Sequence, residues 1–167
     1  MDMSDRMDKK RREAFKRLCS LVCMVAFLGA ACSHAPVKGS FGYNSATGEQ
    51  AARAAISMVG KSYKYGGDSP AGFDCSGLVR YSYRTAGLDL PHGTNHLKAI
   101  SRSVGKRGMQ KGDILFFDEK GGKYSHVGIY IGSNQFIHAP NANRSVQKES
   151  LHDPYWENHF RDARRLY

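Results

Sequence analysis

This 167-residue sequence lacks a hydrophobic run long enough to cross a bilayer as a helix, which needs about 20 apolar residues. Its first 31 residues nevertheless differ from the rest. Charged residues crowd positions 2–17, and no charge occurs from Leu18 to Cys32. A basic N-terminal region, a short apolar segment and small residues at its C-terminal end are typical of a bacterial secretory signal. We therefore predict a signal peptide over residues 1–31.

The exit of this segment, LGAAC, resembles the lipobox of bacterial lipoproteins, in which the cysteine is lipidated and becomes the N-terminus. Gly29 stands where lipoboxes usually have Leu, and Leu28 lies one place earlier. The resemblance implies a lipid such as palmitate on Cys32 and, because Ser33 follows, an outer-membrane anchor facing the periplasm. Ordinary signal cleavage and a retained membrane anchor are the alternatives. Residues 32–46 contain Gly, Ser, Pro and Asn without periodicity, which indicates a flexible tether.

Cysteine is scarce, with four residues in the chain. Cys19 and Cys23 lie in the predicted signal peptide, and lipidation would occupy Cys32. Cys75 would then be the only thiol in a compartment where cysteines usually pair, so an intramolecular disulfide is excluded. A buried inert thiol, a metal ligand and a nucleophile remain as possible roles for Cys75.

Basic residues outnumber acidic residues in this chain. The first 31 residues hold seven of the 25 Lys and Arg residues and four of the 15 Asp and Glu residues. The rest of the chain therefore has 18 basic and 11 acidic residues. This excess favours polyanionic surroundings by Coulomb attraction. We expect no nucleic acid partner, because the basic residues are scattered and the chain is exported. A carboxylate-rich cell wall or anionic lipid fits better, and a solvated basic surface without a specific partner is the alternative.

The chain has no internal repeat or low-complexity region, and helical patterns precede strand patterns. We predict a first helix with Thr47 as N-cap, Gln50 three places later and a stop at Gly60. A second helix covers residues 76–86, and a short one follows Thr94. The apolar face of the first helix should consist of Ala52, Ala55, Ile56 and Val59.

Short segments rich in β-branched and aromatic residues occur at 112–117, 126–132 and 135–139, which indicates strands. Helices followed by strands predict an α+β domain over residues 47–167, with N-terminal helices packed on a C-terminal antiparallel sheet. The expected core comprises Phe116, Phe117, Val127, Ile129, Ile131, Phe136 and Ile137.

Cys75 lies where a loop becomes a helix. Helix N-termini favour the thiolate, so we expect a lowered pKa for Cys75. A thiol nucleophile also needs a base, normally histidine. Five of the seven histidines lie in the tether or in polar loop and terminal segments, namely His34, His92, His96, His152 and His159.

His126 and His138 differ, because each lies in an otherwise apolar strand. A tight turn near Ser133 or Asn134 would place His126 almost opposite residue 140 and diagonal to His138. One imidazole could then act as base while the other orients it. Purely structural histidines are the alternative. A Cys-His-His zinc site is a further alternative, but C-x-x-C and H-E-x-x-H spacings are absent from the sequence, and we expect no metal or cofactor.

Six motifs in order resemble the NlpC-type family of papain-like cell-wall cysteine peptidases over Gln50–Tyr167. They are YKYGG at 63–67, DCSGLV at 74–79, KGDILFF at 111–117, SHVGIYIG at 125–132, FIHA at 136–139 and YWENHFRDARR at 155–165. The resemblance implies a papain-like fold, with Cys75 as nucleophile, His126 as general base and His138 as the orienting residue.

The resemblance also implies that the hydroxyl of Tyr63 lies beside the nucleophile, and that Asp74 and Ser76 line the substrate pocket and recognise a free amine. A packed aromatic is the alternative for Tyr63, and a helix cap is the alternative for Asp74. Relatives often carry Arg and Gln in the loop after the catalytic helix, where this chain has His92 and Leu97.

The activity implied by the resemblance is hydrolysis of amide bonds in peptidoglycan stem peptides by a monomeric cysteine peptidase. A non-catalytic wall-binding lipoprotein is one alternative. An amidase or acyltransferase of the same papain-like class is another, since it would use the same residues.

Overall fold

The structure is a computed structural model and describes residues 44–119, 121–140 and 142–166. The predicted signal peptide, Cys32 and nearly all of the predicted tether lie outside the described residues. No helix among these described segments is long and apolar enough to span a membrane.

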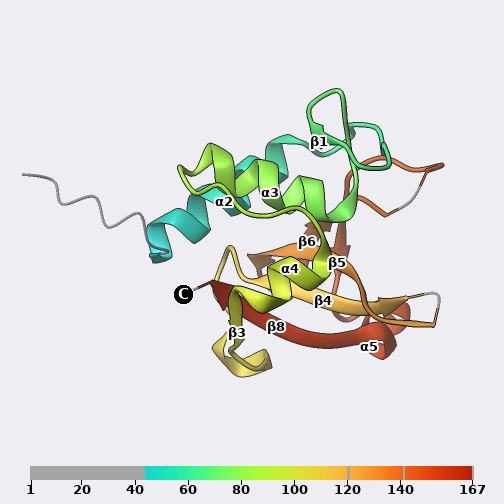
Figure 1. The fold of residues 1–167 in the computed structure, drawn as a ribbon. Helices are drawn as coiled ribbons and strands as arrows, with labels where there is room; N and C mark the ends of the chain where they lie inside the picture. The colour runs from blue at the N-terminus through green and yellow to red at the C-terminus, as the bar shows by residue number, and fades with distance from the viewer. Residues whose placement is uncertain (1–43, 120, 141, 167) are drawn as a thin grey trace, which may run out of the picture. The chain divides into compact units, whose positions relative to one another are not determined.

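The domain combines helices with an antiparallel sheet, which confirms the α+β prediction (Figure 1). The helices are α2 (Ser45–Ser57), α3 (Cys75–Thr85), α4 (Thr94–Ala99), α5 (Pro154–His159) and a 3₁₀ turn, η1 (Lys106–Gly108). The main sheet has the order β3-β8-β4-β5-β6-β7. Its strands are β3 (Ser101–Ser103), β4 (Ile114–Glu119), β5 (Gly122–Gly132), β6 (Gln135–His138), β7 (Gln147–Ser150) and β8 (Phe160–Leu166). β1 (Asp68–Ser69) and β2 (Gly72–Phe73) form a small separate hairpin.

The main sheet carries a core on each face, because alternate side chains of a strand point to opposite sides. Helices α2 and α3 pack together and cover one face, where Phe116 and Val127 are fully buried (Figure 1). Phe117 and Phe136 point to the other face and pack with Trp156 of α5. The predicted core residues are all buried except Ile131, which is half-buried.

Helix α2 corrects the predicted start and the predicted buried face of the first helix. Its N-cap is Asn44, whose Oδ1 accepts hydrogen bonds from the N–H and hydroxyl of Thr47 at 2.8 and 3.1 Å. Thr47 therefore lies inside the helix. Ile56 and Val59 are 47% and 48% exposed, because the helix packs through its small residues. Its buried residues are Gly48, Ala51, Ala52, Ala54 and Ala55.

The β5–β6 hairpin has the predicted register. Ser133 and Asn134 have φ angles of 52° and 56°, as a two-residue type I′ turn requires. Ile129 pairs with Ile137, so His126 and His138 lie diagonally on one face of the sheet. Strands β3, β7 and β8 were not predicted from the sequence, which indicated strands only at 112–117, 126–132 and 135–139.

Candidate active site

Cys75 is the first residue of α3, directly after the N-cap Asp74. The Asp74 carboxylate accepts the Gly77 N–H at 2.7 Å, which fixes the start of the helix. The main-chain N–H groups of Val127, Ser76 and Cys75 hydrogen-bond the half-buried sulfur. The first turn of α3 therefore lies against β5 at the residue that follows His126.

The thiol is less acidic than the sequence predicted. Burial, followed by the charge of Asp74, raises the pKa of Cys75 from 9.0 to about 11. The three N–H groups act in the opposite direction but are weaker. The expected lowering of the pKa is therefore wrong, because burial and an adjacent carboxylate outweigh the helix N-terminus.

His126 and His138 form a buried pair. Nε2 of His126 lies 2.8 Å from Nδ1 of His138, and the two rings are nearly perpendicular. Their exposed fractions are 3% and 0%. Burial first, then the charges of His126 and Arg144, lowers the pKa of His138 to about 2, so His138 stays neutral. Trp156 packs on both rings, with its ring centre 5.8 Å from that of His126 and 4.7 Å from that of His138.

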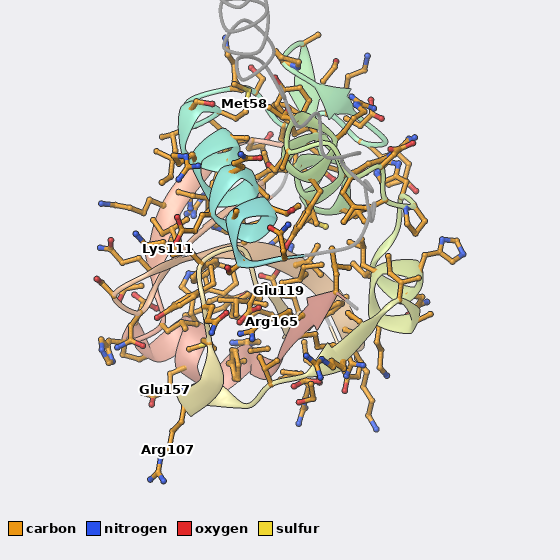
Figure 2. All side chains as sticks on the ribbon, turned by 90° about the vertical axis from the view of Figure 1, so that its left-hand side faces the viewer. Met58, Arg107, Lys111, Glu119, Glu157 and Arg165 are labelled. Carbon is orange, nitrogen blue, oxygen red and sulfur yellow. The ribbon has the colours of Figure 1, made fainter. Side chains whose placement is uncertain are left out.

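A carboxylate that the sequence analysis did not single out lies near the second ring nitrogen of His126, the one that does not face His138. Oε2 of Glu119 is 3.4 Å from Nδ1 of His126, and its Oε1 accepts the hydroxyl of Tyr155 at 2.7 Å. This hydrogen bond raises the pKa of Tyr155 to about 12. The Ser125 hydroxyl bridges the main-chain N–H and C=O of Glu119 at 2.7 Å each. Figure 2 shows Glu119 below the helical layer, whereas Glu157 projects from the lower edge of the domain.

Glu119 was missed because it lies between the predicted strands at 112–117 and 126–132, in a segment to which the sequence analysis assigned no role. Tyr155 and Trp156 were noted only as part of a family motif, without a role. The hairpin pairing of Glu119 with Gly122 could have suggested that this carboxylate lies near His126. Its contact with Tyr155 joins residues far apart in the sequence, and periodicity carries no signal for such a contact.

Tyr63, Asp74 and Ser76 gather around the thiol. Burial, then the charges of Cys75 and Asp74, raises the pKa of Tyr63. The Asp74 carboxylate accepts hydrogen bonds from the hydroxyl of Ser76 at 3.1 Å and from the N–H of Gly66 at 3.0 Å. Asp74 therefore caps the helix and also ties down the loop before it.

His92, which the sequence placed in a polar loop and which was set aside as a candidate base, also reaches Asp74. Its Nε2 lies 2.9 and 3.1 Å from the two carboxylate oxygens. The sequence signal was the position of His92 where relatives often have Arg.

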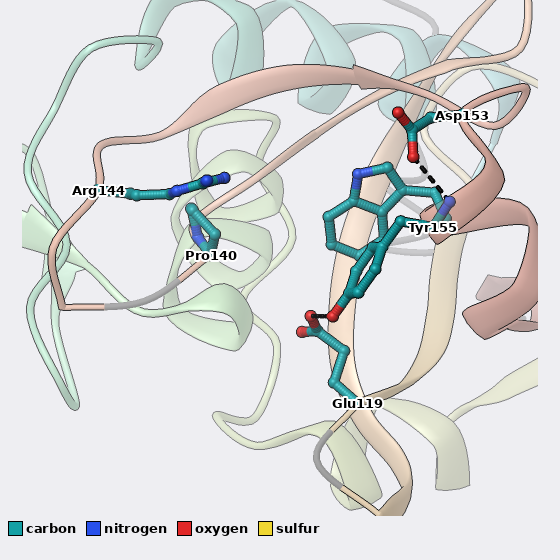
Figure 3. Close-up of a pocket in the computed structure, with 6 residues that line it drawn as sticks. Glu119, Pro140, Arg144, Asp153 and Tyr155 are labelled. Atoms are coloured by element: carbon teal, nitrogen blue, oxygen red, sulfur yellow. Dashed lines mark hydrogen bonds between the residues drawn. The ribbon is translucent and has the colours of Figure 1, made fainter.

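A cavity of about 350 Å³ adjoins the histidine pair (Figure 3). It is lined by Glu119, Pro140, Arg144, Asp153, Tyr155 and Trp156. Two of these residues, Glu119 and Trp156, contact His126. Within the described ranges, no group of three or more His, Cys, Asp or Glu residues is placed to hold a metal ion.

A model of the NlpC/P60 family matches residues 60–165. Murein DD-endopeptidase MepS/Murein LD-carboxypeptidase of Escherichia coli K12 is 39% identical over 108 residues, covering 64% of this chain and 56% of that protein. The probable endopeptidase NlpC of the same organism is 37% identical over 155 residues, covering 90% of this chain and 99% of that protein.

Among solved structures, a lipoprotein-like NLP/P60 family protein from Staphylococcus aureus superposes with a TM-score of 0.66 at 31% identity. The match covers 75% of this chain and 43% of that one. The chain therefore spans about half the length of MepS and of the staphylococcal protein. With a family model matching well over half of its residues, and NlpC aligned along nearly its whole length, this chain belongs to the NlpC/P60 family.

Proposed function

We propose that this protein is a cysteine peptidase that hydrolyses amide bonds in peptidoglycan stem peptides. The names of MepS and NlpC as endopeptidases support this activity. The observation that carries the proposal is the buried His126–His138 pair, joined at 2.8 Å, beside a thiol held by three main-chain N–H groups. A packed structural histidine would not need a second histidine as its partner next to the only cysteine of the domain.

In the proposed mechanism, Nδ1 of His126 removes the proton from the Cys75 thiol as the sulfur attacks the amide carbonyl carbon. Negative charge develops on the carbonyl oxygen, and main-chain N–H groups at the start of α3 stabilise it. The carbon–nitrogen bond then breaks, and His126 gives its proton to the leaving amine. This leaves a thioester on Cys75 and a neutral His126.

Water completes the cycle. His126 takes a proton from water as the water oxygen bonds to the thioester carbon, the carbon–sulfur bond breaks, and the proton returns to the sulfur. One amide bond and one water become one carboxylic acid and one amine. His138 takes no proton in this scheme; it positions His126 by accepting the Nε2–H of that ring at Nδ1.

Tyr63, Asp74 and Ser76 are proposed to line the pocket for the acyl part of the substrate. The electrostatic effect of Cys75 on Tyr63 supports a place for the Tyr63 hydroxyl beside the nucleophile. Asp74 already has four hydrogen-bond donors, from Gly66, Ser76, Gly77 and His92. Recognition of a substrate amine by Asp74 would therefore displace or share one of these donors, and His92 is the most exposed side chain among them.

The proposed location is the cell envelope, with stem peptides as substrate and no cofactor. A lipid on Cys32 and a tether over residues 32–46 would let the catalytic domain reach the wall from the membrane. The positive charge of the chain supports attraction to wall carboxylates.

The decisive experiment compares the wild type with Cys75→Ala on purified sacculi. Cys75→Ala should abolish the release of muropeptides, while its melting temperature stays within a few degrees because a half-buried thiol loses little packing. Retained digestion by this variant would refute Cys75 as nucleophile. Mass spectrometry of the products would identify the bond that is cut and distinguish a peptidase from an amidase or an acyltransferase.

A further inference from the structure

Basic residues gather in one stretch of the chain that the catalytic scheme does not use. Residues 90–112 contain five Lys and Arg residues and no Asp or Glu. The structure places four of the five in exposed positions around Arg165, near the end of β8. We call these four the basic face: Arg102 on β3, Lys106 and Arg107 on η1, and Lys111 in the loop before β4.

Arg165 joins the three segments that carry the basic face. Its guanidinium pairs at 2.7 Å with the buried Asp113, two positions after Lys111, and donates at 2.8 Å to the main-chain oxygen of Gly108 in η1. Arg102 lies directly opposite Arg165 in the register of β3 and β8. Because Asp113 balances the charge of Arg165, the four exposed cations around this pair set the charge of the surface.

The charge of the basic face is not cancelled by neighbouring acids. Within the described ranges, no ion pair involves any of its four side chains. Asp162 of β8 is already paired with Arg164 at 2.8 Å. Glu157 is an exposed acid at the same lower edge of the domain, and Figure 2 shows Arg107 projecting past it. One acid against four cations leaves a positive surface.

We propose that the basic face docks this domain on an anionic phospholipid membrane, with its cations against the headgroup phosphates. Lys and Arg side chains close to such a surface are attracted to it individually, and the attraction adds up over a cluster. This docking goes beyond the proposed peptidase activity and does not depend on it. Charge alone would also fit the carboxylates of a cell wall, so the position of the face decides between the two occupants.

The basic face lies beside the start of the domain. A Cβ on Gly112, the residue after Lys111, would lie 2.3 Å from Cα of Gly48 near the start of α2. Asn44, the N-cap of α2, comes twelve positions after Cys32. Twelve residues span at most about 43 Å when fully extended. A membrane that held Cys32 would therefore be within reach of this end of the domain.

Docking at the basic face leaves the active site uncovered. In the main sheet, β8 and β4 separate β3 from β5, which carries His126, and three strand spacings amount to about 14 Å. Lys111 contacts the far end of β5 at Gly132, six residues and about 20 Å from His126. A wall held at this face would keep its stem peptides at that distance from the histidine pair. A membrane held there leaves the site free for them, which favours the membrane as occupant.

The test maps the contact in the full-length chain, reconstituted in vesicles of phosphatidylcholine alone or of phosphatidylcholine mixed with phosphatidylglycerol. The N-terminal segment is the same in both, so headgroup charge is the only difference. Lysines are acetylated briefly and quantified by mass spectrometry. Lys106 and Lys111 should lose most of their reactivity in the anionic vesicles only. Lys123 on β5 and Lys148 on β7, both exposed, should react equally in the two kinds of vesicle.

Charge variants of the same chain test whether the basic face causes this protection. Arg102→Gln combined with Arg107→Gln should weaken docking about 30-fold, because each cation near an anionic surface contributes about fivefold. Lys106 and Lys111 should then recover the reactivity that they have on phosphatidylcholine. Lys123→Gln combined with Lys148→Gln is the matched control, since it removes two charges elsewhere and should keep the protection. All four changes are at exposed positions and should leave the melting temperature unchanged.

Three results would overturn the inference. Lys106 and Lys111 could react equally in both kinds of vesicle, or the control variant could lose their protection as well. Protection by purified sacculi without protection by anionic vesicles would assign the face to the wall instead. True docking should also weaken as the ionic strength rises through about 0.1 M, where charges are screened beyond about 10 Å. Failure of the proposed peptidase activity would not affect these readouts, because a Cys75→Ala chain should show the same protection.

Discussion

The thiol of Cys75 should be almost entirely protonated at neutral pH in the free protein. Burial and the Asp74 carboxylate raise its pKa from 9.0 to about 11. Two pH units correspond to about 2.7 kcal/mol against the thiolate. At pH 7.5 only about one thiol in 3,000 is then ionised, compared with about one in 30 for an unperturbed cysteine. His126 must therefore remove the proton during the attack, since no thiolate is formed beforehand.

The assay is alkylation of Cys75 by iodoacetamide as a function of pH, followed by mass spectrometry of the peptide that contains this residue. This readout separates Cys75 from the three cysteines near the N-terminus. The rate should rise about tenfold per pH unit through the neutral range, because the thiolate is the reactive form. A plateau below pH 8 would refute the reasoning, because it would reveal a thiolate stabilised by a protonated His126.

Asp74→Asn tests the cause of the shift. Asparagine caps a helix about as well as aspartate, so the start of α3 should persist while the negative charge is lost. The alkylation profile should move to lower pH without reaching that of a free cysteine, because burial is the larger cause. An unchanged profile would show that Asp74 does not contribute.

Three further predictions concern His138 and Gly77. His138 has a folded-state pKa of about 2 against 6.5, so its contribution to stability is present above pH 6.5 and is lost as the pH falls toward 2. Urea denaturation should show a loss of up to about 1.4 kcal/mol per pH unit below pH 6.5, and His138→Gln should make that slope shallower. In muropeptide assays, His138→Gln should retain more activity than His138→Ala, because the amide oxygen can still accept the Nε2–H of His126; equal losses would contradict an acceptor role. Gly77→Ala should destabilise the domain by about 3 kcal/mol in the same denaturation assay, since a Cβ there would lie 1.9 Å from the carbonyl oxygen of Gly67. Gly108→Ala should be close to neutral, because its Cβ would lie 3.9 Å from Cβ of Val104, an ordinary contact distance.

The hairpin that carries both histidines could be predicted from the sequence because two local rules agree. The Ser133–Asn134 turn joins two strands of alternating side chains, and a shift of one residue would move every core residue to the wrong face. Other local signals placed Cys75 at a helix start. Gly and Asp precede it and an apolar helical face follows it, and together they mark that boundary. Both features depend on residues close together in the sequence.

The remaining parts of the site depend on contacts between distant segments. Glu119 meets Tyr155 across 36 positions of sequence, and His92 reaches Asp74 from a polar loop without periodicity. The exposed Ile56 on α2 shows a related limit, because the helical pattern identified an apolar face while packing selected the alanines beside it. The predicted direction of the shift in the Cys75 pKa was wrong. The position of Cys75 at a helix start is visible in the sequence, whereas the depth of its burial is not.

The proton positions in the histidine pair limit what His138 can do. For Nδ1 of His126 to accept the thiol proton, the hydrogen of neutral His126 must be on Nε2 and point to Nδ1 of His138. His138 then carries its own hydrogen on Nε2, a buried atom with no hydrogen-bond partner among the described residues. Such an unsatisfied group costs about 1–3 kcal/mol, and the low pKa of His138 prevents a second proton from joining it. In the proposed mechanism only Nδ1 of His126 gains and loses a proton, so His138 is a fixed acceptor that sets the tautomer and orientation of the base.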